Sequence, residues 1–159
     1  MRRIKLFEGF SRSHPQYTEQ ELKSGITDCL VELNDLGNFE YQINIDLNDN
    51  YVCVVIKVDE SDVPDEEYFH TTKTFDCTDQ VIAESVMFLS DYMRETFGRN
   101  LYTEYWIYDS NDYPFTLTEY PTKDYLLKLE EEEEEDFEDN KWKIDSIQLT
   151  TKLMIKYKW

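Results

Sequence analysis

The chain has 159 residues, 40% of them hydrophobic and 15% aromatic, so it is long enough for one globular domain with its own core. Four glycines and four prolines are too few for a largely disordered chain. The formal net charge of −19 gives a field that repels nucleic acids and anionic membranes and attracts basic surfaces.

Cysteine usage and hydropathy favour a cytoplasmic protein. Cys29, Cys53 and Cys77 are odd in number and lack metal-ligand spacing, so we interpret them as buried thiols in a reducing compartment. The apolar stretch after Arg2 and Arg3 is too short for a secretory signal. No run approaches the roughly 18 apolar residues of a membrane span.

The first predicted element is an amphipathic helix from Thr18 to Gly37. Its apolar residues recur with helical spacing, and Gly37 is suited to end it. Thr18 and Glu21 have the spacing of a capping box, which satisfies backbone N–H groups at a helix start.

Three strands are predicted next. Alternation over residues 39–47 and the apolar run 51–58, separated by turn residues, indicate a hairpin. The acidic loop 59–67 then leads to a third strand over residues 68–75, which is rich in threonine and aromatic residues.

The second half of the chain continues the alternation of helices and strands. We predict a helix over 78–97 ended by Gly98, strands over 101–108 and 115–120, a third helix from Thr122 into the acidic run, and one long or two short strands over 141–159.

The element order is therefore α-β-β-β-α-β-β-α-β, which predicts an α+β fold. We expect a mixed or antiparallel sheet with two to three packed helices, in a single domain spanning residues 1–159. Residues 130–140 form an acidic spacer or an extension of the third helix; both alternatives stay open.

The first helix, three strands and second helix resemble the double-stranded-RNA-binding domain in their order. That family contacts RNA phosphates through Lys and Arg at the start of its second helix, and here the segment reads Asp76, Cys77, Thr78, Asp79 and Gln80. We therefore expect no direct binding of nucleic acid.

Catalytic patterns are incomplete. His70 and Thr72 have the His-x-Thr form of two-histidine phosphoesterases, but Pro15 and Gln16 follow the other histidine, His14, so the second half of the pair is missing. The carboxylates of the 59–67 loop lack the order of a calcium loop. We expect no enzymatic activity, no cofactor and no bound metal.

The acidic run is the most unusual segment, because nine of the ten residues from Glu130 to Asp139 are acidic. A continuous helix there would place one charge per about 1.5 Å, close to the about 1.7 Å per charge along duplex DNA. The run can thus mimic a phosphate backbone, or it can be a solvated spacer.

Two other acidic segments lie at predicted turns, and one of them interleaves carboxylates with Tyr and Trp, a mixture that supplies steering charge and contact area. The predicted partner-binding residues are Asp59, Glu60, Asp62, Asp65, Glu66, Glu67, Glu104, Tyr105, Trp106, Asp109, Asp112, Tyr113, Glu130, Glu131, Glu132, Glu133, Glu134, Glu135, Asp136, Glu138 and Asp139.

The first ten residues, MRRIKLFEGF, resemble the N-termini of small accessory proteins of T-even-like tailed phages, in which a basic start precedes a short apolar motif. Leu6, Phe7 and Phe10 match that motif. The resemblance implies a phage protein that acts in the cytoplasm of a bacterial host, where small acidic phage proteins often inhibit nucleic-acid enzymes.

These observations predict a non-enzymatic acidic inhibitor that occupies the basic nucleic-acid-binding surface of a host defence or nucleic-acid enzyme. Two alternatives fit the same charge: an immunity or antitoxin protein that neutralises a basic toxin, and a structural or assembly protein of a phage particle. In the first two cases the partner is a basic protein.

Overall fold

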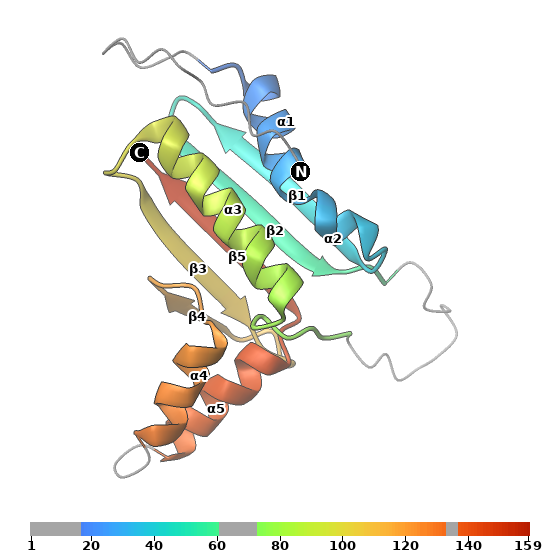
Figure 1. Cartoon of the computed structure of the whole chain (residues 1–159), viewed down its shortest axis with the longest axis vertical. Coiled ribbons are helices and arrows are strands. Elements are labelled where there is room, and N and C mark those ends of the chain that lie inside the picture. Colours follow the sequence, from blue (N-terminus) through green and yellow to red (C-terminus); the bar gives the residue numbers. More distant parts are fainter. Residues whose placement is uncertain (1–16, 61–72, 133–136) are drawn as a thin grey trace.

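The protein has an α+β fold, in which helices cover one face of a five-stranded antiparallel sheet (Figure 1). The computed structural model describes residues 17–60, 73–132 and 137–159. The predicted fold class is confirmed, and the sheet is the antiparallel one of the two alternatives.

Ten elements make up this fold. The helices are α1 (Glu19–Cys29), α2 (Val31–Asp35), α3 (Gln80–Phe97), α4 (Lys123–Glu131) and α5 (Phe137–Gln148). The strands are β1 (Phe39–Asp46), β2 (Tyr51–Val58), β3 (Tyr102–Tyr108), β4 (Pro114–Leu117) and β5 (Lys152–Lys158).

The strand order is β1-β2-β5-β3-β4, so β5 lies in the middle of the sheet. The hairpins β1–β2 and β3–β4 are each formed by neighbours in sequence. β5 pairs along its whole length with β2 on one side and β3 on the other, and it thereby joins the two hairpins into one sheet.

Alternation along each strand divides the sheet into two faces. On the core face, Val54 is opposite Ile155, which is opposite Tyr105 on the next strand. Val54 and Ile155 are fully buried, and Tyr105 is nearly so. On each of these strands, the residues before and after the one named here point to the other face.

Three helices cover the core face. Figure 1 shows α3 crossing the sheet in front of β2 and β5, with α1 and α2 beside it over β1. Ile26 on α1 and Val86 and Leu89 on α3 are fully buried in the hydrophobic core that these helices form with the sheet. This burial of apolar surface is the main force that holds the helices in place.

A small hydrogen-bond network sits within this core. The Ser90 hydroxyl on α3 lies 3.1 Å from the Tyr105 hydroxyl and 3.0 Å from the Tyr157 hydroxyl. Burial raises the pKa of both tyrosines, so both stay neutral. The network satisfies polar groups that would otherwise be buried without partners.

The predicted helix boundaries follow local signals. Thr18 and Glu21 form the predicted capping box, Thr122 accepts from the Tyr125 N–H at the start of α4, and Gly98 ends α3 with a φ of +93°. The helix predicted from 18 to 37 is instead interrupted at Leu30, and both Leu30 and Leu33 of its second part remain fully buried.

Two strand predictions differ from the structure. The segment from Lys141 was expected to begin a strand, but residues up to Gln148 belong to α5, and the strand begins at Lys152. The third strand predicted over 68–75 lies mostly outside the described residues; its last residue, Phe75, forms an isolated bridge with Thr150.

Close packing of α1 on α3 generates a prediction about Gly25. A Cβ at Gly25 would clash with the Tyr92 ring and its hydroxyl. Gly25→Ala should therefore lower the free energy of unfolding in urea by about 1–2 kcal/mol, although alanine has the better helix propensity.

Ser24→Ala, at an exposed position of the same helix, serves as the control and should be neutral or slightly stabilising. In a Tyr92→Ala background the effect of Gly25→Ala should largely disappear. A stabilising effect of Gly25→Ala in the wild-type background would show that the two helices are not in close contact.

Candidate partner-binding surfaces

The acidic run lies at the end of a helical hairpin. α4 and α5 lie side by side and project from the end of the sheet beyond β4 (Figure 1). The Asn140 side chain donates to the Leu129 carbonyl at 3.3 Å across the two helices. Leu126 and Leu129 of α4 and Ile147 of α5 are buried and belong to the hydrophobic core.

The run does not form one continuous helix through its described residues, because α4 ends at Glu131 and α5 begins at Phe137. We define the hairpin tip as its five described carboxylates, which are all exposed: Glu130, Glu131, Glu132, Glu138 and Asp139. Glu133, Glu134, Glu135 and Asp136 lie outside the described residues.

The tip carboxylates form no salt bridge among the described residues. The salt bridges of the described residues join Lys57 to Glu40, Arg94 to Asp91 and Lys152 to Asp112, and none of them includes the tip. Glu130, Glu131 and Glu132 also lie at the C-terminal end of α4, where negative charge opposes the helix dipole. These three residues therefore work against the helix that carries them.

The predicted contact residues of the 59–67 loop are described only at its start. The Asp59 N–H donates to the Asn38 carbonyl at 2.7 Å, and the Glu60 carboxylate accepts from the Lys73 N–H at 3.4 Å. Both residues leave the sheet at the end of β2, away from the hairpin tip (Figure 1). Asp62, Asp65, Glu66 and Glu67 lie outside the described residues.

Two predicted contact residues are in the interior, so their assignment to a partner surface was wrong. Tyr105 is 7% exposed and points into the core toward Ser90. Asp109 is 5% exposed, and its carboxylate accepts from the N–H groups of Asn111 and Tyr113 in the turn after β3. It shapes that turn, as aspartate side chains commonly do.

The other predicted residues of this segment are accessible. Glu104 and Trp106 lie on the face of the sheet opposite the core, whereas Asp112 and Tyr113 are exposed in the β3–β4 turn. Glu104 accepts from the Tyr102 hydroxyl at 2.7 Å and from Trp106 Nε1 at 3.1 Å. The hydrogen bond from Tyr102 is the main reason that the pKa of Glu104 is lowered.

The face opposite the core, the open sheet face, has no described helix over it (Figure 1). Strand register places a row of lysines on β5 beside a row of aromatic side chains on β3. The lysine row consists of Lys152, Lys156 and Lys158, with Lys57 beside it on β2, and the aromatic row consists of Tyr102, Trp106 and Tyr108.

The two rows are in direct contact. Lys156 Nζ lies 3.8 Å from the centroid of the Trp106 ring, and Lys152 Nζ lies 3.9 Å from that of Tyr108. Such cation–π contacts contribute about 0.5–1 kcal/mol at exposed sites. They hold the ammonium groups against the sheet without removing them from solvent.

Charge is unevenly divided between the two faces. α1, α2 and α3 together carry eight carboxylates and two basic side chains. The strand residues of the open sheet face carry four lysines and three carboxylates, Glu40, Asp46 and Glu104. The helical face and the hairpin are therefore acidic, whereas the open face has a basic centre.

A shallow cavity of about 270 Å³ lies at one end of the lysine row. Glu60 and Asp112, two predicted contact residues, line it together with Lys57, Lys152 and Ser110. These two carboxylates thus neighbour lysines and do not extend the acidic surface of the hairpin.

Sequence reasoning missed the open sheet face. The signal was present, because Lys152, Met154, Lys156 and Lys158 alternate with buried apolar residues. What the sequence did not reveal was that this strand lies in the centre of the sheet, next to the aromatic residues of β3.

Within the described ranges, no three or more His, Cys, Asp or Glu side chains converge as a metal site would require. None of the helices in this part of the chain is long and apolar enough to span a membrane.

Comparisons of the chain with protein-family models, curated proteins and solved structures found no match.

The tip carboxylates lie at the C-terminal end of α4 and at the N-terminal end of α5, so replacing the two groups should have opposite effects on stability. Glu130→Gln, Glu131→Gln and Glu132→Gln together should raise the thermal midpoint, because they remove negative charge from the C-terminal end of α4, at a few tenths of a kcal/mol per charge.

Glu138→Gln with Asp139→Asn should lower the midpoint, because these residues lie in the first turn of α5. Calorimetry at low salt measures both effects, and both should shrink as salt is added. A loss of stability in the α4 variant would show that its carboxylates make contacts that support the fold.

Proposed function

We propose that the protein is a non-enzymatic inhibitor whose acidic hairpin enters the basic nucleic-acid-binding groove of a partner protein. The partner is a defence or nucleic-acid enzyme of a bacterial host, and the inhibitor is an accessory protein of a tailed phage. The observation that carries the proposal is the exposed cluster of carboxylates at the end of the projecting hairpin.

Shape supports this role. Two packed helices form an element about 20 Å across, which is comparable with a nucleic-acid duplex. Because the hairpin projects from the sheet, its tip can enter a groove that the body of the protein cannot enter (Figure 1). An acidic element of this size is complementary to a channel lined by Lys and Arg.

Energetics also favour a functional role for the tip. Three glutamates at the C-terminal end of α4 destabilise their own helix, and no described salt bridge compensates them. Residues that lower local stability and make no compensating contact within the protein are typical of binding sites.

The remainder of the acidic surface contributes at longer range. The carboxylates of α1, α2 and α3 add to a negative field that raises the rate of encounter with a basic partner. Such steering is screened by salt over about 8 Å at physiological ionic strength, whereas contacts in a groove are screened less.

The test compares two variants of equal charge. In the tip variant the five tip carboxylates are replaced: Glu130→Gln, Glu131→Gln, Glu132→Gln, Glu138→Gln and Asp139→Asn. In the control variant five exposed carboxylates of the helical face are replaced: Glu19→Gln, Asp28→Asn, Glu32→Gln, Asp35→Asn and Glu95→Gln.

Each protein is used to capture partners from a nuclease-treated bacterial lysate, and the captured partner is then purified for titration. The tip variant should bind it at least about tenfold more weakly than wild type, whereas the control variant should lose only about twofold to threefold. Single-stranded or duplex DNA should compete with the wild-type protein for that partner.

Equal losses in the two variants would contradict insertion of the hairpin and leave only a general effect of charge. A partner that binds no nucleic acid would contradict the proposed target, and a basic toxin would favour the immunity alternative. Circular dichroism of both variants shows whether the fold is intact.

A further inference from the structure

The open sheet face carries chemistry that the acidic hairpin does not explain. The lysine row on β5 and the aromatic row on β3 run parallel on neighbouring strands, with Tyr102 opposite Lys158 and Tyr108 opposite Lys152. Neighbouring strands are about 4.8 Å apart, and residues on one face of a strand follow at about 6.6 Å. The rows thus form a narrow track of cations beside a track of rings.

From this juxtaposition we infer that the open sheet face binds single-stranded nucleic acid. The phosphates lie along the lysines of β5, and the bases stack on the rings of β3. Proteins that bind single strands combine these two features, a basic path for the backbone and aromatic side chains for the bases.

The aromatic row is already ordered for stacking. The Glu104 carboxylate accepts from both Tyr102 and Trp106, so it fixes the two rings that flank it along β3. These hydrogen bonds also engage the charge of Glu104, which lies within the row. Ordering the rings in advance lowers the entropy lost when a ligand binds.

The lysines are positioned to exchange partners. The ammonium groups of Lys156 and Lys152 rest over the rings of Trp106 and Tyr108. When a base stacks on a ring, the flexible lysine can move to the adjacent phosphate. Cation–π contacts at exposed sites are weaker than base stacking on an aromatic side chain, so this exchange favours the complex.

Glu40 and Asp112, the carboxylates paired with lysines of the open sheet face, do not prevent the binding of phosphates. Lys57 and Lys152 each form a surface salt bridge, at 3.2 Å to Glu40 and 3.7 Å to Asp112, and such pairs are weak. Lys156 and Lys158 form no salt bridge with any described residue. Neither of these two ammonium groups is held in a salt bridge there, although Lys156 lies opposite Glu104 and is one of the charges that lower its pKa.

Most carboxylates of the described residues lie away from the open face, whose strand residues include Glu40, Asp46 and Glu104. The carboxylates of α1, α2 and α3 are on the opposite side of the sheet, and the hairpin tip projects beyond its end (Figure 1). The sheet lies between the helix carboxylates and the open face, and salt in solution screens their field there. The expectation of no nucleic-acid binding was based on the net charge of −19 and on the start of α3, which is on that helical side.

An acidic peptide is the other polyanion that would suit the lysine row. It has no planar rings to place on Trp106 and Tyr108, so it would leave half of the surface unused. The pairing of rings with cations therefore favours nucleic acid. The inference is independent of the proposed inhibition, because it uses none of the tip residues.

The probe is a fluorescently labelled oligothymidylate of about eight nucleotides, titrated at about 50 mM salt and followed by anisotropy. Trp106→Ala should weaken binding by about tenfold. The double variant Lys156→Ala, Lys158→Ala should also weaken it about tenfold and should lower the salt dependence.

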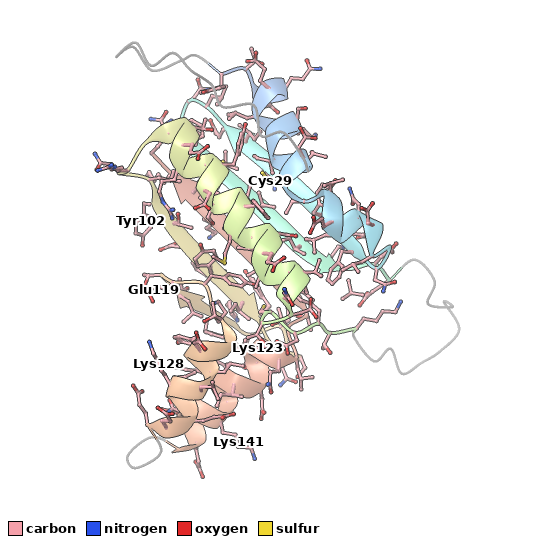
Figure 2. All side chains as sticks on the ribbon, viewed as in Figure 1. Cys29, Tyr102, Glu119, Lys123, Lys128 and Lys141 are labelled. Atoms are coloured by element: carbon pink, nitrogen blue, oxygen red, sulfur yellow. The ribbon has the colours of Figure 1, made fainter. Side chains whose placement is uncertain are left out.

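Lysines of the hairpin provide the matched control. Lys128 and Lys141 lie on α4 and α5, away from the open face (Figure 2). Lys128→Ala with Lys141→Ala removes the same charge and should leave the affinity within about twofold. The five-residue tip variant should bind the oligonucleotide at least as tightly as wild type.

Three results would overturn the inference: no binding of the oligonucleotide, an equal loss in the control variant, or equal affinity for a glutamate peptide of the same charge. Failure here with an intact effect of the tip variant on partner capture would leave the proposed function standing. Circular dichroism excludes misfolding as the cause of a lost signal.

Discussion

The pairing of β5 with both of its neighbours is the constraint on which the rest of the structure depends. β1–β2 and β3–β4 are hairpins of local origin, and a two-stranded hairpin is marginally stable by itself. β5 joins them by hydrogen-bonding to both inner strands. Only with β5 in place is there a continuous apolar face on which α1, α2 and α3 can pack.

The same strand also gives the two faces their different character. Leu153, Ile155 and Tyr157 are fully buried under α3, and the side chains between them point to the open face. Because strand periodicity is two, a shift of one residue in the register would bury the lysines and expose the core. The fold and the lysine row are thus set by one pairing, which ties the proposed surface to the stability of the domain.

Local structure could be predicted from the sequence where a single segment carried the signal. The capping residues Thr18 and Thr122, the helix end at Gly98 and the β1–β2 hairpin were all identified correctly. The helix over Phe137–Gln148 was missed, because its weak apolar periodicity was merged with the alternation of β5 that follows. Periodicity alone does not show where one pattern gives way to the next.

The candidate surfaces were harder to predict, because exposure depends on tertiary pairing. Tyr105 and Trp106 are adjacent in sequence, but one faces the core and the other the open face. Alternation predicts that two adjacent residues of a strand point to opposite faces of the sheet. It does not show which of the two is buried until the face covered by helices is known. The acidic run was singled out from the sequence because its charge is contiguous in the chain, but its place at the end of a helical hairpin was not predicted. The lysine row could be recognised only once the strand order was known.

The late position of β5 in the chain has a consequence for biosynthesis. β2 and β3 leave the ribosome well before residues 152–158, so the slot between them stays open while α4 and α5 are translated. Throughout that interval two inner strands have unpaired edges, which are the usual templates for aggregation. Three of the seven residues of β5 are lysines, and charged side chains of this kind disfavour pairing of a strand with another chain before it docks.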